Sequence, residues 1–357
     1  MENVPIAGLD DLDQHLNELL ATPDETTLNA KLFDDVELQL TEHNISPLIP
    51  RLLPKLTEIL TTYQKDPEVL VSLAIKLLQP VPFTQVLTLA SETSLIQALR
   101  SPAPSANILA ITVIAKAARS PSDTAILSIM KNVVENFLKT WLSTPYVEVG
   151  EKATNALADL LRVDFDRRSA AELELRMNGM EIDSNKPSGQ GLLWRRIFQD
   201  KEIYELLFSL CSFQNMGTGE GQLDERQKSL AQARLLRILP RLAALDFATL
   251  SHSHFPDIEE RYGMEGEQRS LLYFAAENMV DKEDLLMHIT LIDFFAEFLE
   301  KMSDTNLSPT TMEYLAALMR EVTIDDTRIY ESLEALALNP ETSPELMDLL
   351  VRLNQSG

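Results

Sequence analysis

Three short stretches carry residue types that could do chemistry. The segment GTGEG (217–221) has closely spaced glycines like those of phosphate-binding loops, and HSHF places His252 and His254 two residues apart, as metal ligands can be. Cys211 is the single cysteine and could act as a nucleophile. The glycine segment lacks a preceding strand pattern and the Lys-Ser/Thr ending of a P-loop, so we expect a helix–helix connection there.

Structural interpretations fit the other two stretches better. No cysteine or further histidine lies close in sequence to complete a zinc site at His252 and His254, where Asp257 and Glu259 are the nearby carboxylates. Cys211 lies in an apolar run without a neighbouring histidine, which favours a buried thiol. Among 55 acidic residues, no pair of carboxylates stands out as an acid–base pair. The sequence therefore predicts no catalytic residue, no metal site and no cofactor, and we expect a protein that is not an enzyme.

One tripeptide has the composition of a protein-binding site. Trp194, Arg195 and Arg196 follow a glycine-containing loop directly, and tryptophan and arginine are enriched at the centres of interfaces. The alternative is that Trp194 packs in the core while the two arginines are solvated or pair with acidic helices. Our hypothesis is that these three residues bind a partner.

Composition points to a helical, acidic protein. The chain has 357 residues, of which 45% are hydrophobic and only 11 are glycine, and this favours helices. A formal net charge of −24 argues against a nucleic-acid groove, which needs clustered Lys and Arg, and fits either a basic protein partner or simple solubility. The single cysteine, the lack of a signal-peptide pattern and the lack of a membrane-length apolar run lead us to expect a soluble, intracellular protein.

Charge is distributed unevenly along the sequence. Residues 1–60 hold 12 acidic and 3 basic residues, and residues 281–348 hold 16 and 4. Between them, residues 191–241 hold 8 basic and 6 acidic residues. A mildly basic middle between acidic ends suits one partner touching several surfaces, although solvated helix faces produce the same pattern.

Helical spacing of apolar residues dominates the chain, and one design recurs. Three segments open with Asp, Ser or Thr before a proline and continue into a helix rich in Val, Ile, Leu and Ala; their prolines are Pro67, Pro102 and Pro145, which are 35 and 43 residues apart. Further helical segments lie between them. Periods near forty residues with two helices each are typical of HEAT and armadillo arrays, and an irregular helical bundle is the alternative. Elsewhere, we expect a helix to begin near Pro54 and another to kink or end near Pro240.

The segment from Leu142 to Asp164 shows what such an array demands. Small and branched residues fall on one side of an ideal helix there, namely Ala153, Ala156, Leu157, Leu160 and Leu161. The rest of the helix is only partly charged, so it needs apolar neighbours on more than one side, as a unit in a stack has.

The predicted fold class is therefore all-α, a curved α-solenoid of HEAT/armadillo-like repeats. We expect a single domain over 1–357, with N-terminal repeats at 1–164, middle repeats with inserted loops at 165–250 and acidic C-terminal repeats at 268–357. Irregular loops are expected near 177–191, 213–224 and 251–267, where Gly, Pro, Asn and Ser interrupt the periodicity.

Four stretches together resemble a known family: PVPFTQVLTLASETSLIQAL, SPAPSANILAITVIAKAARSPSD, WLSTPYVEVGEKATNALADLL and GQGLLWRRIFQDKEIYELLFSLCS. They are similar to fungal members of the HEAT/armadillo-repeat family of proteasome regulatory-particle assembly chaperones, which also carries a DNA mismatch-repair label. The likeness covers roughly residues 80–245, within a repeat array, and GQGLLWRRIF (189–198) is its most distinctive segment.

The resemblance implies a non-catalytic chaperone for the base of the proteasome regulatory particle. Such a chaperone binds the C-terminal helical domain of one ATPase subunit through a solenoid surface and helps it assemble with neighbouring base subunits. From charge and composition we expect a cytoplasmic protein, with the nucleus as an additional compartment, that binds neither nucleic acid directly nor membrane, and we expect a monomer. The alternative is a general HEAT-repeat scaffold or transport-type adaptor that holds a basic segment on an acidic face. A mixed, partly apolar face with Arg195 and Arg196 would favour the chaperone.

Overall fold

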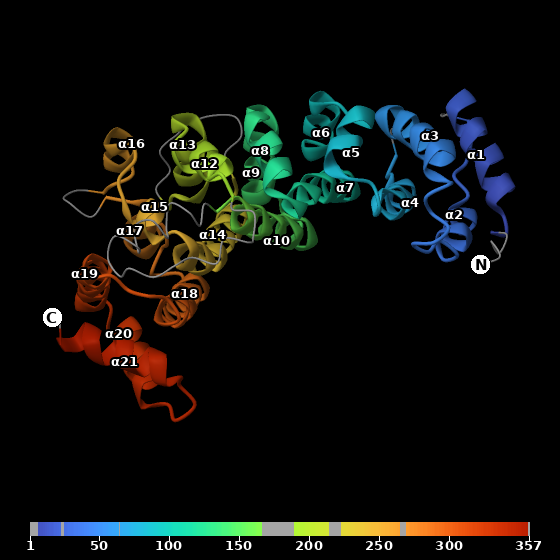
Figure 1. Ribbon diagram of the computed structural model, residues 1–357. Helices are drawn as coiled ribbons and strands as arrows, with labels where there is room; N and C mark the ends of the chain where they lie inside the picture. Colours follow the sequence, from blue (N-terminus) through green and yellow to red (C-terminus); the bar gives the residue numbers. More distant parts are fainter. Residues whose placement is uncertain are drawn as a thin grey trace. The chain divides into compact units, whose positions relative to one another are not determined.

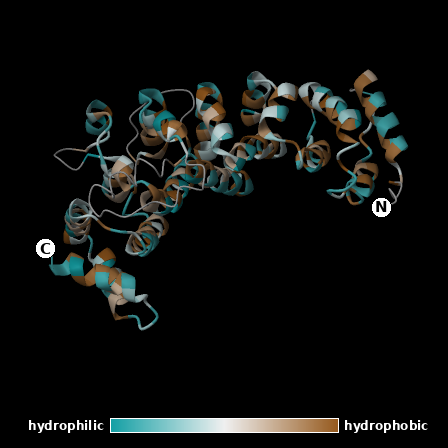
Figure 2. Cartoon of the chain, in the orientation of Figure 1, coloured by the Kyte–Doolittle hydropathy of each residue, from teal (hydrophilic) through white to brown (hydrophobic). Residues whose placement is uncertain are grey.

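The computed structural model describes residues 6–22, 25–63, 65–165, 189–213, 223–264 and 269–355. Within these ranges every regular element is a helix and no β-strand occurs, which confirms the all-α class (Figure 1). Figure 2 shows hydrophobic and hydrophilic residues interleaved along the helices, as amphipathic packing requires. None of the described helices is both long enough and apolar enough to cross a membrane.

Two compact units make up the chain, Met1–Thr140 (unit 1) and Trp141–Gly357 (unit 2). The predicted single domain and its three subdivisions stay a prediction. The elements of unit 1 are α1 (Leu9–Ala21), α2 (Ala30–Glu37), α3 (Ile49–Thr62), α4 (Glu68–Leu78), α5 (Phe83–Leu89), α6 (Glu92–Leu99), α7 (Pro104–Ala115), η1 (Lys116–Arg119), α8 (Pro121–Ile129) and most of α9 (Lys131–Ser143). Here α1 packs on α2 and α3, α2 and α3 pack on α4, and α4, α5 and α6 pack on α7. Packing on near neighbours in sequence is the mark of stacked helical repeats.

Unit 2 follows the same rule. Its elements are α10 (Val147–Asp164), α12 (Leu192–Phe198), α13 (Lys201–Cys211), α14 (Glu225–Leu245), α15 (Phe247–Ser251), α16 (Pro256–Arg261), α17 (Leu271–Tyr273), the π-helical turn η2 (Phe274–Asn278), α18 (Leu285–Ser303), α19 (Pro309–Asp325), α20 (Thr327–Leu338) and α21 (Pro344–Gln355). The long helix α14 packs on α10, α13 and α18, while α18 and α19 both pack on α20 and α21. Successive layers therefore bury each other's apolar sides.

Helix α10 confirms the expectation drawn from its small residues. Ala153, Ala156, Leu157, Leu160 and Leu161 are all buried. Both α12 and α14 pack on this helix. Apolar neighbours on two flanks are what an internal layer of a stack requires.

Two helices run through a proline. Helix α3 begins at Ile49, not near Pro54 as predicted. Helix α14 continues past Pro240 to Leu245, so the predicted helix end there is wrong and the predicted kink stays a prediction. Pro50 lies in the first turn of α3, where a missing N–H breaks no helical bond, and Pro54 then forfeits a single one. Burial of the flanking leucines stabilises both helices enough to offset that loss.

The recurring Asp, Ser or Thr before proline shapes a turn just ahead of the helix. Asp66 Oδ1 accepts a hydrogen bond from Glu68 N at 3.1 Å, Ser101 Oγ accepts one from Ala103 N at 3.2 Å, and the Thr144 hydroxyl accepts one from Tyr146 N at 3.3 Å. These bonds span two residues, so they are Asx- and ST-turns. In the second and third segments the helix starts only at Pro104 and Val147, later than the pattern predicts.

One predicted loop contains a helix. The stretch 251–267 was expected to be irregular, but α16 occupies Pro256–Arg261 and buries Ile258 and Glu259. A proline and two carboxylates in its first turn favour a helix start. The loop prediction rested on composition and did not take these positions into account. The loops predicted at 177–191 and 213–224 lie largely outside the described residues, and so does GTGEG.

A buried lysine closes a helix end in unit 1. The Lys116 ammonium, on η1, donates to the carbonyl oxygen of Leu78, the last residue of α4, at 2.6 Å, and to that of Val81, just after the helix, at 3.0 Å. Carbonyls at a helix end have no partner within the helix and need an outside donor. Lys116 is only 6% exposed, and its burial, together with nearby Arg119, lowers its pKa to about 8.

Candidate functional site

The most distinctive sequence segment, 189–198, docks α12 against the end of α10. A side chain at Gly189 would collide with the backbone of Asp164, and Gly191 adopts a left-handed φ of 63° while its N–H donates to Asp164 O at 2.8 Å. Asp164 Oδ2 accepts hydrogen bonds from Leu193 N at 2.7 Å and Trp194 N at 3.1 Å. The two glycines thus allow one carboxylate to cap α12.

The Asp164 carboxyl is fully buried, and burial raises its pKa although the N–H groups of α12 act in the opposite direction. Among the described residues, its Oδ1 atom has no hydrogen-bond partner. The group therefore serves as a structural cap that carries an electrostatic cost.

The tripeptide after these glycines is divided between core and surface. Trp194 is buried, its indole N–H donates to Leu161 O at 2.8 Å, and its ring packs on Phe198 at a centroid distance of 5.2 Å. Arg195 is exposed and donates to the carbonyl of Gln190, whereas Arg196 pairs with Asp200 at 2.7 Å. The core interpretation holds for Trp194; a partner-binding role for the tripeptide stays a prediction.

One residue counted in the basic middle region is not at the surface. The Arg234 guanidinium, on α14, is buried, and its Nη1 donates to the carbonyls of Trp141 at 2.9 Å, Leu142 at 3.2 Å and Thr144 at 2.8 Å. Gly150 faces this guanidinium so closely that a Cβ there would overlap it. Burial lowers the pKa of Arg234. This arginine closes the turn between α9 and α10 and is unavailable to a partner.

Two further arginines of α14, Arg237 and Arg241, lie on an exposed face. Arg237 pairs with Glu151 of α10, and Arg241 approaches Glu297 of α18 with Nε and Oε1 4.0 Å apart. By helical spacing, Val147 shares a stripe of α10 with Glu151, and Ile289 shares one of α18 with Glu297. We call the surface formed by these six residues the arginine face; Figure 1 shows its three helices side by side.

The arginine face combines both charges with exposed apolar groups. Val147 is 57% exposed and Ile289 is 47% exposed. The face is therefore mixed and partly apolar, as expected of a chaperone surface, yet Arg195 and Arg196 belong to α12 instead. Exposed ion pairs contribute about 0–1 kcal/mol, so a partner's carboxylates can replace Glu151 or Glu297 at little cost.

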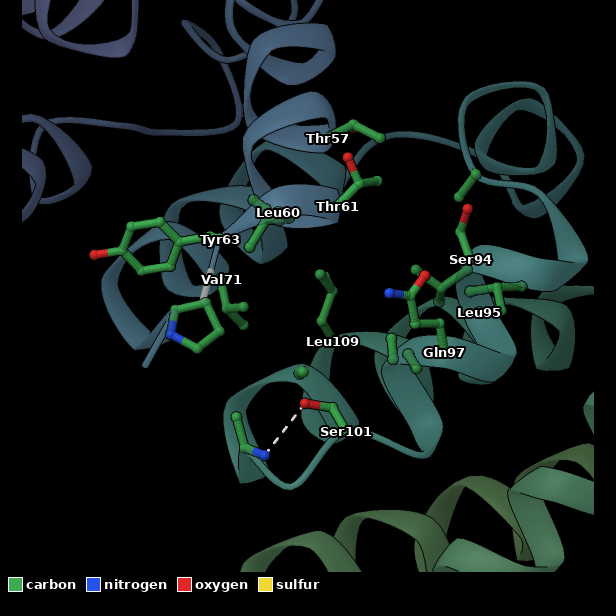
Figure 3. A pocket seen from close by; sticks show the side chains of 18 of the residues that line it. Thr57, Leu60, Thr61, Tyr63, Val71, Ser94, Leu95, Gln97, Ser101 and Leu109 are labelled. Atoms are coloured by element: carbon green, nitrogen blue, oxygen red, sulfur yellow. Dashed lines mark hydrogen bonds between the residues drawn. The ribbon is translucent and has the colours of Figure 1, made fainter. Parts of the chain in front are cut away.

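Unit 1 contains a pocket of about 650 Å³ lined by side chains of α3 to α7. Figure 3 shows Leu60 of α3, Leu95 of α6 and Leu109 of α7 around it. Hydroxyl groups and apolar carbons make up most of the lining, and Lys65 and Asp66 are the charged residues among the described ones that form it. Such a lining accommodates neutral, apolar groups.

Of the histidine and cysteine candidates, His252 is exposed, whereas His254 and Cys211 are engaged in packing. A ring nitrogen of His254 lies 2.8 Å from Thr249 O, and the buried Glu259 accepts a hydrogen bond from the Tyr204 hydroxyl at 3.0 Å. Complete burial raises the pKa of the Cys211 thiol, which disfavours the reactive thiolate. Within the described ranges no three His, Cys, Asp or Glu side chains converge to hold a metal ion. That the protein is not an enzyme stays a prediction.

Stacked helices and a mixed exposed face define a protein of the helical-repeat class. Residues 10–167 match the family model of the N-terminal domain of the DNA mismatch repair protein HSM3, so this part of the chain is similar to that domain. The predicted family resemblance is thereby confirmed for this range; the match begins well before residue 80, and the likeness beyond residue 167 stays a prediction. No curated protein sequence matches the chain.

Proposed function

We propose that this protein is a non-catalytic assembly chaperone for the base of the proteasome regulatory particle. It binds the C-terminal helical domain of one ATPase subunit through its helical-repeat surface. The observation that carries the proposal is the match of residues 10–167 to the HSM3 family, whose resemblance implies this activity. The stacked helix pairs of both units suit such a role, because they expose long surfaces without an enclosed active site.

The arginine face of unit 2 is the surface we assign to the ATPase domain. It offers two arginines beside two carboxylates, with Val147 and Ile289 as apolar contacts. Arginine is enriched among the residues that contribute most to binding, and exposed apolar side chains add apolar area that is buried on association. Charges of both signs fix the orientation of a partner, whereas an all-acidic face would accept any basic segment.

The alternative, a scaffold or adaptor for a basic segment, is favoured by one observation. The net charge of −24 attracts basic proteins over long distances. Charge steering alone has little selectivity and weakens with salt, so salt dependence separates the two functions.

The direct test is binding of the full chain to the isolated C-terminal helical domain of each base ATPase subunit, measured by calorimetry at physiological salt. We expect one domain to bind. Reversing Arg237 and Arg241 together to Glu should weaken binding at least tenfold and leave the helical content unchanged, since both are exposed. The matched control reverses Arg261 and Arg269, which are ion-paired arginines of unit 2 outside this face.

A third double variant, Arg195→Glu with Arg196→Glu, tests the α12 tripeptide separately. Weaker binding of this variant alone would move the interface to α12. Failure of every ATPase domain to bind, together with salt-sensitive binding of basic peptides, would replace the chaperone by the adaptor.

A further inference from the structure

Helix α20 leaves several of its apolar side chains exposed. Of its twelve residues only Ile329 is buried, whereas Tyr330 is 53% exposed and Leu338 is 77% exposed. Leu333 and Ala337, on the next turns, are half-buried. Exposed apolar surface concentrated on one helix is typical of an interaction site.

A groove lies beside this surface. It has a volume of about 270 Å³ and is lined by side chains from α18 to α21, most of them apolar. The polar residues of the lining are Arg320, Thr323, Glu334 and Asn354. We call it the C-terminal groove. Its volume suits a few side chains, and a row of anchors three and four residues apart is how an amphipathic helix binds in a groove.

Carboxylates outnumber cations in the helices that form the groove, although Glu334 and Arg320 both line it. Residues 326–355 contain six carboxylates and two arginines. Glu331 and Glu334 of α20 and Glu345 of α21 are exposed. Arg352 already pairs with Asp348 at 3.7 Å. An occupant with lysines or arginines beside its apolar anchors is therefore complementary in charge.

The same charge disfavours a second copy of this chain. A dimer through the groove would bring two acidic C-terminal regions together, each from a chain of net charge −24. Like charges that face each other across an interface disfavour association.

We propose that the C-terminal groove binds an amphipathic helical segment of another protein, with apolar anchors inside the groove and flanking lysines or arginines against Glu331, Glu334 and Glu345. This site goes beyond the proposed function, because its lining comes mainly from α19, α20 and α21 and not from the arginine face. A chain with both sites holds two protein segments at once.

The probe for this proposal is a labelled helical peptide of about 18 residues with leucines at i, i+3, i+4 and i+7 and lysines elsewhere. Its binding to the full chain is followed by fluorescence anisotropy. Slower amide exchange in residues 327–338 of the complex reports the place of binding. We expect saturable binding, protection of α20, and at least tenfold weaker binding of a peptide with glutamates in place of the lysines.

Three variants locate the site. Leu333→Arg fills the groove with charge, and the double variant Glu331→Lys with Glu334→Lys reverses the exposed rim without touching the core. Both should weaken binding at least tenfold while leaving the affinity for the ATPase domain unchanged. The control, Ile129→Arg, changes a 75% exposed apolar residue of unit 1 and should bind like the parent chain.

Several results would overturn the proposal. These are absent peptide binding, equal binding of the glutamate peptide, equal binding by both groove variants, and protection elsewhere than α20. Concentration-dependent dimerisation that Leu333→Arg abolishes would assign the groove to a second copy instead.

Discussion

Lys116 in unit 1 and Arg234 in unit 2 meet the same requirement with different chemistry. Each is a buried cation from a later helix that donates to carbonyl oxygens at the end of an earlier one. The ammonium is a compact charge on which a tight set of carbonyls converges, whereas the guanidinium is a planar fork that reaches carbonyls spread over six residues, from Trp141 to Tyr146. The wider fork needs room, and Gly150 provides it. A helix stack thus depends on long-range donors at its turns as well as on apolar layers.

The largest expected effect tests whether the Arg234 guanidinium is needed for the stability of unit 2. Arg234→Met leaves at least three buried carbonyls without a donor, so we expect unit 2 to lose about 3–5 kcal/mol of stability. Both tryptophans, Trp141 and Trp194, lie in unit 2, so urea unfolding followed by tryptophan fluorescence reports on this unit. Arg237→Met, on the exposed face of the same helix, is the control and should change stability by less than about 0.5 kcal/mol. Similar losses in the two variants would contradict the assigned role of Arg234.

The corresponding change in unit 1 should cost less. Lys116→Met removes one donor group, but it also removes a partly desolvated charge, so we expect a loss of about 1–3 kcal/mol. Because unit 1 has no tryptophan, the lowered transition should be visible in far-ultraviolet circular dichroism. Lys31→Met, an exposed lysine of α2, serves as the control. A larger loss than in Arg234→Met would reverse the ranking of the two cations.

Gly150, which faces the Arg234 guanidinium, provides a further test of this contact. Gly150→Ala should destabilise unit 2 by about 1–2 kcal/mol, since a Cβ forces the guanidinium away from its carbonyls. In the Arg234→Met background the same substitution should be neutral or stabilising, because alanine is the better helix former. Additive effects of the two changes in a double-mutant cycle would show that the contact is unimportant.

The smallest effect is a pH dependence confined to the lysine. The folded-state pKa of Lys116 is about 8, below its ordinary value of 10.5, so the folded protein releases this proton first as pH rises. Stability should therefore increase between pH 8 and pH 9 by at most about 1 kcal/mol relative to Lys116→Met. Arg234, protonated throughout, should give no such difference from Arg234→Met. A parallel pH profile in Lys116→Met would refute the shifted pKa.

Local periodicity made much of the fold predictable. The spacing of Ala153, Leu157 and Leu160 was enough to predict a doubly flanked helix, because burial on a helix follows its own repeat. The start of α3 was predicted too late because of Pro54. Burial of Leu52 and Leu56 outweighs the one hydrogen bond that this proline removes.

The sites were harder to predict, because they depend on contacts between distant residues. In the sequence, Lys116 and Arg234 look like ordinary surface charges. The residues next to them do not indicate that they bind carbonyl oxygens 35 to 93 residues away. Trp194 had two interpretations, of which burial in the core was the favoured one, and its hydrogen bond to the carbonyl of Leu161 supports that one. The C-terminal groove was missed because a row of apolar residues on α20 predicts a buried face until its neighbours are known.

The family domain and the compact unit end at different places. The family match reaches residue 167, whereas unit 1 ends at Thr140, inside α9. A fragment cut at residue 167 would keep α10 but lose α14, and with it Arg234 and the cover over Ala153 and Leu157. Such a fragment should expose apolar surface of α10 and aggregate on expression, although its borders follow the family match. For this chain, the family match extends beyond the compact unit in which it begins.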